Sequence, residues 1–485
     1  MRTLLLLAAA LAGYTASAYA AHSALATDSP APAAQVARKK PMADAPIELI
    51  TLDPGHFHAA LIQRELYPGV ATRAHVYAPL GQDLLDHLGR VLRFNERKES
   101  PTRWELEVHT GPDFLERMTR EKPGNVVVIS GRNRGKIDAV RAATAAGLNS
   151  LVDKPWILGS AELPQLQSVL DLADQQQLIA LDIMTERFEV TSLLQRELVN
   201  DEAVFGKIER GTTEQPGVYM ESVHHLLKTV AGVPNIRPTW FFDTAQQGEG
   251  SSDIGTHLVD LVQWTLFPEQ ALDYKKDIEI VDAQRWPTRI SREDFERVTR
   301  EKEFPAFLAK NQKGGFLECF LNNLVTYKVR GIHTRLNVIW DYQAPAGAGD
   351  THYAVYRGSQ ARIEVRQGKA EKWRTELYVI PTAAVRAAGV ERALRQRLSA
   401  LSAAYPGLSV ELRGTELRVV IPEGLRTSHE QHFGQVARRF FELLKNPSRL
   451  PAWEKPNMLA KYWVTTRGTE LSRKSPVKVA KRLAP

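Results

Sequence analysis

Hydrophobic residues recur along the chain in two rhythms, and the first runs from residue 46 to residue 184. There, short apolar runs alternate with segments whose apolar residues are spaced as on one face of a helix. The continuous β-branched run Val126 to Ile129 is typical of a parallel strand that is buried on both faces. Repeated strand–helix units predict a parallel, doubly wound sheet with right-handed crossovers. The expected strands are Ile47 to Leu52, Ala74 to Tyr77, Trp104 to His109, Val126 to Ile129, Ser150 to Val152 and Leu178 to Ile183, and the expected helices are Ala59 to Leu66, part of Gly81 to Arg103, Pro112 to Thr119, Lys136 to Ala146 and Leu163 to Gln176.

After residue 185 the rhythm changes, and runs with strand-like alternation dominate. Several strands in succession predict one large, mostly antiparallel sheet, so the fold class is α/β with two unlike sheets. We expect a hairpin over Leu408 to Ile421 that turns at Arg413-Gly414. The other expected strands are Gly206 to Thr213, Ile278 to Ala283, Phe316 to Leu321, Thr326 to Arg330, Thr334 to Trp340, Tyr353 to Arg357, Ala361 to Arg366 and Glu376 to Ile380, and the expected helices are Thr191 to Asn200, His257 to Phe267, residues 383 to 404 and His429 to Leu444.

The first 20 residues have the pattern of a secretory signal peptide. Arg2 precedes the apolar run Leu4 to Leu11, and small residues suited to cleavage follow at Ala16-Ser17-Ala18 and Ala18-Tyr19-Ala20. The alternative is an uncleaved anchor, but the run is too short to span a membrane in a mature protein. We therefore expect a periplasmic or secreted protein without a membrane segment after cleavage, with a flexible Ala- and Pro-rich linker over residues 21 to 45.

Charge and cysteine content exclude several classes of function. The formal net charge of +7 is spread along the chain, and the clustered basic groups lie near its two ends. A nucleic-acid partner would require a basic stripe on a folded face, so none is expected. The single cysteine, Cys319, excludes an internal disulfide and a cysteine-based zinc site. Its place in an alternating run indicates a buried structural thiol.

A glycine turn follows the first expected strand, in the segment Asp53-Pro54-Gly55-His56-Phe57-His58. Glycines at such a strand-to-helix turn let the backbone approach the pyrophosphate of a dinucleotide. Only the middle glycine is present, and no acidic residue ends the second strand to bind a ribose, so NAD and NADP stay open. A tight turn that binds nothing is the alternative. The two histidines form a His-x-His pair that could seed a metal site, but no third ligand lies near in sequence, and we expect no metal.

Two further segments carry candidate chemistry about a hundred residues apart. Lys154 ends a predicted parallel strand, where ligands bind in open α/β sheets, and Pro155 keeps it extended. Asp253 and His257 are four residues apart and share one face of a helix. A lysine and a histidine at one site could share the proton of a substrate hydroxyl. The alternatives are a surface lysine at a strand end and a capped helix start with a partnered core histidine.

At these residues the chain resembles the Gfo/Idh/MocA family, named for glucose–fructose oxidoreductase and inositol dehydrogenase. The resemblance rests on Asp153-Lys154-Pro155 and on the run Asp253 to Asp260, in the family's order and context. It implies a Rossmann domain over residues 46–184 and a C-terminal α/β domain over residues 185–485 with a large open sheet. The turn is degenerate, Arg132 stands where proline is usual, and the segment after residue 380 points to a subgroup with a distinct C-terminal domain.

The resemblance also implies the roles of site residues. Lys154 and His257 would be the catalytic pair, with Asp253 in support. NAD or NADP would be bound by Asp53, Gly55, His56, Phe57, His58, Ser130, Gly131, Asn133, Asp153 and Lys154. A homo-oligomer is expected, because open sheet faces in this family often pair.

Export narrows the expected reaction. No free nicotinamide pool renews a cofactor outside the cytoplasm, so a redox-neutral cycle on a sugar or glycoside with a retained cofactor is favoured. Aromatic and histidine side chains before the Gly-rich run, namely Tyr219, His224, His225 and Trp240, are expected to line the sugar site. The alternative is a non-catalytic carbohydrate-binding protein on a degenerate scaffold. The enzyme hypothesis requires that Lys154 and His257 face one cavity and that the crevice above Gly55 is open.

Overall fold

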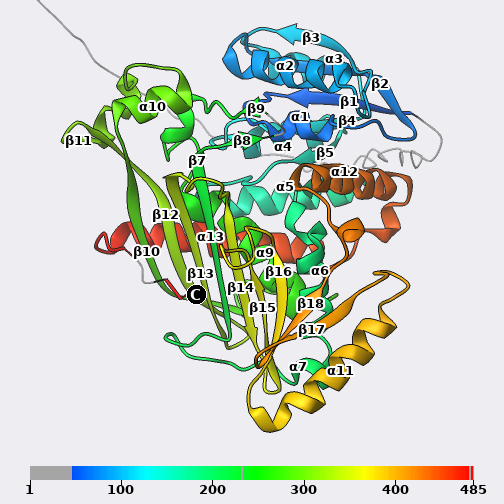
Figure 1. Cartoon of the computed structure of the whole chain (residues 1–485). Helices are drawn as coiled ribbons and strands as arrows, with labels where there is room; N and C mark the ends of the chain where they lie inside the picture. The colour runs from blue at the N-terminus through cyan, green and yellow to red at the C-terminus, as the bar shows by residue number, and fades with distance from the viewer. Residues whose placement is uncertain (1–45, 231–232, 480–481, 484–485) are drawn as a thin grey trace, which may run out of the picture. The chain divides into compact units, whose positions relative to one another are not determined.

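Two large β-sheets organise the part of the chain that the computed structural model describes, namely residues 46–230, 233–479 and 482–483 (Figure 1). The predicted signal peptide (1–20) and linker (21–45) lie outside these residues. Within the described ranges, no helix combines the length and the apolar character needed to cross a membrane.

The first sheet has six parallel strands in the order β3-β2-β1-β4-β5-β6. The chain leaves β1 in one direction along the sheet and returns to β4 on its other side, which creates a switch point at the carboxyl ends of these two strands. The expected parallel, doubly wound sheet is thus confirmed. The strands are β1 Ile47–Leu52, β2 Val70–Ala78, β3 Glu105–Thr110, β4 Val126–Ile129, β5 Asn149–Val152 and β6 Ala180–Asp182, and the helices between them are α1 His58–Ile62, α2 Gln82–Glu96, α3 Phe114–Glu121, α4 Lys136–Ala145 and α5 Leu163–Gln175.

Helix α1 is shorter than the sequence predicts. It ends at Ile62 rather than Leu66. The indole N–H of Trp104 donates to the Gln63 carbonyl (2.7 Å), and the Arg97 guanidinium donates to the Arg64 carbonyl (2.5 Å). The Tyr67 hydroxyl donates to the Ile62 carbonyl (2.7 Å), the oxygen that the Leu66 N–H would use if the helix continued.

The second sheet has ten strands and is antiparallel except where β13 runs parallel to β7. This confirms the expected large, mostly antiparallel sheet, although β12 joins two predicted strands into one. Its strands are β7 Val218–Leu227, β10 Ile278–Ile290, β11 Gln312–Lys313, β12 Phe316–Val329, β13 Ile332–Gln343, β14 Thr351–Arg357, β15 Ala361–Arg366, β16 Glu376–Pro381, β17 Ser409–Arg413 and β18 Glu416–Val420, while β8 Thr229–Val230 and β9 Val233–Pro234 pair separately.

Two strand assignments in this half were wrong. The predicted strand Gly206 to Thr213 makes only isolated bridges, because Gly206 and Gly211 adopt positive φ angles (76° and 64°) that break an extended ladder. Strand β7 was missed: it is buried along almost its whole length, so it lacks the alternation that marks a half-exposed strand.

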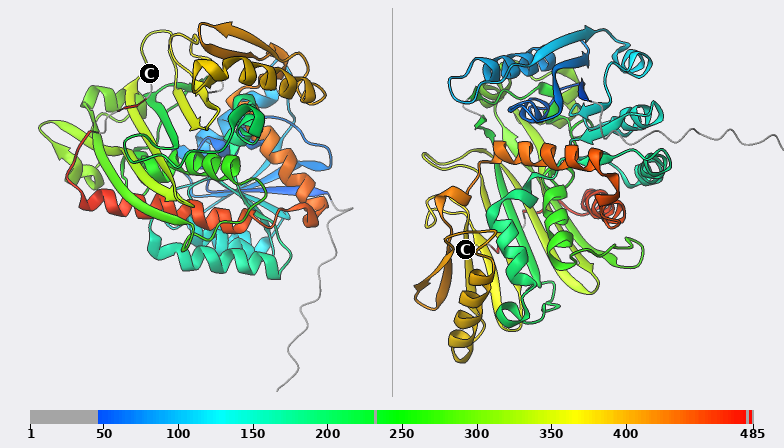
Figure 2. Two further views of the ribbon diagram at one scale, coloured as in Figure 1. Left: turned by 90° about the horizontal axis from the view of Figure 1, so that it is seen from below. Right: turned by 90° about the vertical axis from the view of Figure 1, so that its right-hand side faces the viewer.

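The last two helices return to the first sheet. Helix α12 (His429–Lys445) matches its predicted bounds closely, and its apolar face joins the core around β1. Helix α13 (Glu454–Lys474) was not predicted; it contacts β10 and β12 of the second sheet and also α5 (Figure 2). The two sheets therefore share these helices. The remaining helices are α6 Val190–Val199, α7 Glu202–Phe205, α8 Gly250–Asp253, α9 Gly255–Leu266, α10 Arg292–Thr299 and α11 Ala387–Ala400.

Candidate active site

Lys154 and Asp253 meet although they are 99 residues apart in the chain. Lys154 follows the carboxyl end of β5, and Asp253 ends the short helix α8. The Lys154 ammonium donates a hydrogen bond to Asp253 Oδ1, and the lysine side chain is 2% exposed while that of the aspartate is 10% exposed. His257, in the first turn of α9, lines the same cavity as both. The spatial requirement that Lys154 and His257 face one cavity is therefore met.

The charges of this group favour an ionised aspartate and a neutral histidine. Burial acts to raise the pKa of Asp253, but the Lys154 charge and hydrogen bond outweigh it and hold the pKa well below its usual value. Burial and the nearby Lys154 charge both lower the pKa of His257. Its Nδ1 is buried and has no hydrogen-bond partner among the described residues. Because His257 lines the cavity, its neutral imidazole can form a hydrogen bond with a ligand there.

The shared cavity is large, with a volume of about 1170 Å³, and both polar and apolar side chains line it. Eight of the chain's 13 histidines line it, namely His56, His58, His224, His225, His257, His352, His429 and His432. A cavity of this size can enclose a small-molecule ligand.

Sequence reasoning missed several of its acidic and basic groups. Glu186 follows β6, and burial beside Glu189 raises its pKa to about 7. Asp350 accepts hydrogen bonds from His225 Nδ1 (3.0 Å) and from the Lys228 ammonium (2.7 Å). A possible signal was the position of Glu186 just after a predicted strand, where ligands bind in parallel sheets.

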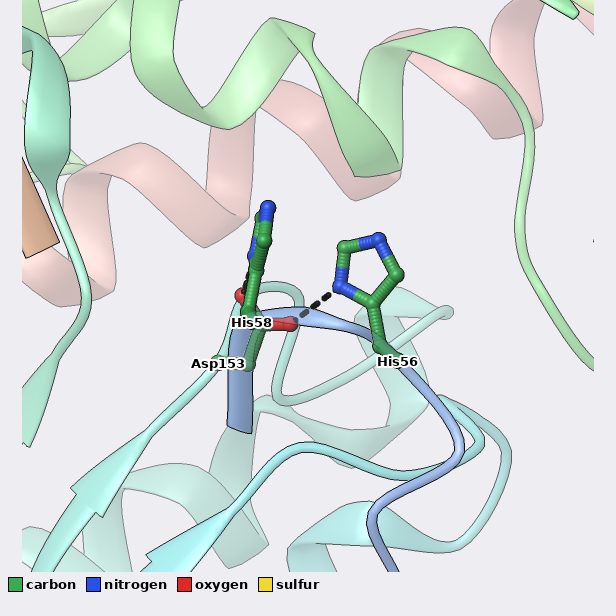
Figure 3. A group of neighbouring side chains, drawn as sticks. All are labelled: His56, His58 and Asp153. Atoms are coloured by element: carbon green, nitrogen blue, oxygen red, sulfur yellow. Dashed lines mark hydrogen bonds and ion pairs between the residues drawn. The ribbon is translucent and has the colours of Figure 1, made fainter. Parts of the chain in front are cut away.

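A second group of polar side chains lies at the glycine turn (Figure 3). The Asp153 carboxylate accepts hydrogen bonds from His56 Nδ1 (2.7 Å), His58 Nδ1 (3.0 Å) and the Ser130 hydroxyl (3.0 Å). Burial acts to raise the pKa of Asp153, but the two imidazoles hold it well below its usual value. Burial lowers the pKa of both histidines in spite of the carboxylate. The third partner that the His-x-His pair lacked near in sequence is supplied by the fold.

Three residues predicted to bind the cofactor serve the packing of the turn instead. Ser130 is held by Asp153, Gly131 lies against Asp53, and the Asn133 side chain donates to the Gln247 carbonyl (2.7 Å). A Cβ on Gly131 would lie 2.3 Å from the Asp53 carboxylate, so only glycine fits there. Neither the large cavity nor the small void at Gly55 is lined by these three, nor by Asp53 or Asp153. Their polar atoms already have intramolecular partners in this structure, and their contact with a cofactor stays a prediction.

The expectation of an open crevice above Gly55 was wrong. A Cβ placed on Gly55 would lie 3.1 Å from the Trp240 ring and 3.3 Å from the Asp83 carboxylate. The Trp240 indole N–H donates to Asp83 Oδ2 (3.0 Å), and the space left beside the turn is only about 30 Å³. Trp240 and Asp83 therefore cover this side of the turn in the described structure. The large cavity is open to the other predicted cofactor-binding residues, namely His56, Phe57, His58 and Lys154.

The four predicted sugar-binding residues divide into two pairs. His224 and His225 line the large cavity, where they flank Asp350. Trp240 does not line it, because its ring covers Gly55. Tyr219 is completely buried in β7 and donates to Glu221 Oε2 (2.7 Å). The predictions for Trp240 and Tyr219 are therefore corrected: Val218 and Met220 join the apolar core, and Tyr219 lies on the opposite face of β7, where its hydroxyl accepts from the Leu483 N–H (3.2 Å).

Comparison with known proteins identifies the second half of the chain. Residues 194–473, more than half of the chain, match the family model described as "Putative oxidoreductase C terminal domain". No curated protein matches the chain.

Solved structures extend the similarity to the whole described region. A crystal structure described as a putative oxidoreductase from Parabacteroides merdae is 45% identical, with a TM-score of 0.86 over 89% of this chain and 98% of that one. Two others share the fold at a TM-score of 0.51. GenD2 from gentamicin A biosynthesis, solved in complex with NAD, is 14% identical over 89% of this chain and 94% of that one. The 3-ketoreductase KijD10 from Actinomadura kijaniata, solved with TDP-benzene and NADP, is 15% identical over 87% of this chain and 96% of that one. The family model and the 45% identical relative agree with the motifs and with the two sheets. The chain therefore belongs to the Gfo/Idh/MocA family of oxidoreductases, in the subgroup with this C-terminal domain.

Proposed function

We propose that this protein is an exported oxidoreductase that acts on a hydroxyl-bearing carbon of a sugar or glycoside with a nicotinamide cofactor, NAD or NADP. One observation carries the proposal: Lys154, Asp253 and His257 face one large cavity at the carboxyl end of β5 in a chain of this family. Ligands bind at this end of the strands in open α/β sheets.

The three residues can together remove the proton of the substrate hydroxyl and stabilise the oxygen that it leaves. His257 is neutral and its imidazole can take that proton as a general base. The Lys154 ammonium, oriented by Asp253, can hydrogen-bond the same oxygen and stabilise the charge that develops there. When bound, nicotinamide supplies the acceptor for the hydride. Of the residues predicted to bind it, His56, Phe57 and His58 line the cavity beside Lys154 and would hold it.

A sugar is the proposed substrate class because the cavity is rich in groups that pair with hydroxyls. His224, His225 and Asp350 form one wall of it. The 3-ketoreductase KijD10, which shares this fold, was solved with NADP and TDP-benzene. The signal-like N-terminus supports export to the periplasm or the medium, and a redox-neutral cycle with a retained cofactor would suit that location.

The second candidate is a non-catalytic carbohydrate-binding protein. Trp240 over Gly55 favours it, because the pyrophosphate crevice is covered. Both candidates predict sugar binding in the large cavity, and only the enzyme predicts cofactor binding and turnover.

The test uses the full-length protein and its Lys154→Ala and His257→Ala variants. We expect both variants to fold and bind sugar but to lose turnover at least about a hundredfold, as is usual when a general base is removed. Lys154→Ala should also lower the thermal midpoint, because it leaves the Asp253 carboxylate buried without its partner. Lys310→Ala, at a 65% exposed lysine, is the matched control and should keep full activity. Retained turnover in both site variants would refute the assignment of the catalytic pair. Sugar binding without NAD(P) binding by the unmodified protein would establish the second candidate instead.

A further inference from the structure

The two histidines of the glycine turn have free imidazole nitrogens that face the large cavity. Asp153 accepts from the Nδ1 atoms of both His56 and His58 (2.7 Å and 3.0 Å). An ionised carboxylate has no hydrogen to donate, so both Nδ1 atoms carry the hydrogen and both Nε2 atoms keep a lone pair. Among the described residues, neither Nε2 has a hydrogen-bond partner, and both side chains line the cavity.

The two rings stand close together on the same side of Asp153. Their centres are 3.9 Å apart and their planes meet at 61°. Figure 3 shows the second nitrogen of each ring directed away from the carboxylate. Histidines that bind transition metals have this arrangement. The free nitrogen of each ring faces the metal, and a carboxylate behind the rings accepts from the other nitrogen.

Charge and burial also suit a cation at this point. The Asp153 carboxylate behind the two rings is 1% exposed, and the charged groups around it are Asp253, Lys154 and the buried Lys136, whose ammonium donates to the Asp153 carbonyl (2.9 Å). An anion would meet these carboxylates and no hydrogen-bond donor at either Nε2. Imidazole nitrogen is a preferred ligand of Zn²⁺, Ni²⁺ and Cu²⁺.

We propose that His56 Nε2 and His58 Nε2 bind a divalent transition-metal ion at the edge of the large cavity, with Asp153 as the residue that positions both imidazoles. The remaining coordination positions face the cavity and are taken by water or by an oxygen of a cavity ligand. This site would explain why His58 stands where a dinucleotide turn has its last glycine. His56 and His58 are also residues that would hold the cofactor under the proposed function, so the ion and the cofactor would lie side by side at this edge of the cavity. The proposal does not depend on that function, because its test measures binding of the ion to the protein without cofactor.

The test is calorimetric titration of the chelator-treated full-length protein with Zn²⁺ at pH 7.5. We expect one site, and a loss of affinity of at least about tenfold in His56→Ala and in His58→Ala. Asp153→Asn should weaken binding by about 10- to 100-fold, as for other residues that orient metal-ligating histidines, because an amide accepts from only one of the two rings. Circular dichroism and the thermal midpoint report whether each variant is folded.

His109→Ala is the matched control, since His75, Glu107 and His109 form a second possible metal group on β2 and β3. It should keep the affinity within about twofold. Zn²⁺ binding that is lost in His109→Ala and kept in His56→Ala would overturn the proposal. Anomalous diffraction from Zn²⁺-soaked crystals of the unmodified protein needs no variant. A peak about 2.0–2.1 Å from both Nε2 atoms would support the proposal, and no peak there would refute it.

Discussion

Trp240 is expected to control access of a dinucleotide to the turn at Gly55. Its ring lies where a pyrophosphate would approach, and its indole N–H donates to the Asp83 carboxylate at 3.0 Å. The Arg132 guanidinium lies 5.8 Å from the ring centre. A dinucleotide can bind against the turn only after these contacts break. The apparent affinity is therefore the affinity of the open form multiplied by the fraction of molecules that are open.

The size of the effect follows from the contacts. A hydrogen bond to a charged acceptor contributes about 1.5–3 kcal/mol, and Asp83 is only partly buried, so the lower value applies. Trp240→Phe removes this bond and keeps most of the ring, which should shift the opening equilibrium by about tenfold. Trp240→Ala removes the ring as well and should tighten NAD(P) binding further. It should also lower the thermal midpoint, because truncating a buried tryptophan costs about 3–5 kcal/mol.

The assay is titration of the full-length protein with NADH and NADPH, followed by fluorescence and by calorimetry. Trp264→Phe is the matched control, since Trp264 is also buried but packs against Arg196 in the other half of the molecule. Its affinity should equal that of the unmodified protein. The reasoning fails if folded Trp240→Ala binds the cofactor no more tightly than the unmodified protein.

Two further predictions concern stability. His87 is 3% exposed, and burial lowers its pKa from 6.5 to about 4. As the pH falls, the unfolded chain therefore binds a proton at this histidine before the folded protein does, and stability is lost between pH 6.5 and 4. His87→Leu should remove up to about 3 kcal/mol of this loss in urea denaturation at pH 7 and pH 4, and an unchanged pH dependence would contradict the argument. Gly131→Ala should destabilise the protein by about 1–3 kcal/mol, because its Cβ would lie 2.3 Å from the Asp53 carboxylate. Gly389→Ala, at an open position in α11, should be neutral or stabilising by up to about 1 kcal/mol, and equal thermal midpoints of the two variants would show that the clash is relieved.

Local pattern was sufficient for most of the first sheet. The run Val126 to Ile129 is apolar throughout because both faces of β4 are buried. A continuous β-branched run of this length is enough to predict such a strand from the sequence. The hydrophobic pattern does not predict an element that is buried on both faces without alternation, such as β7. It also does not predict an element whose polar groups have partners only in distant parts of the chain. Helix α13 is such a case: Lys461 is 2% exposed and pairs with Asp182 and Asp260, which lie hundreds of residues earlier.

The sequence by itself determined the types of residue at the site and their order along the chain, since Lys154, Asp253 and His257 each sit beside a local signal for a strand end or a helix start. Only the tertiary structure decided which of them meet. It brought Asp153 to His56 and His58, and it laid Trp240 over Gly55. The physical reason is that local conformation depends on near neighbours in the chain. Hydrogen bonds and van der Waals contacts between distant segments depend instead on how the elements pack, which no single segment encodes.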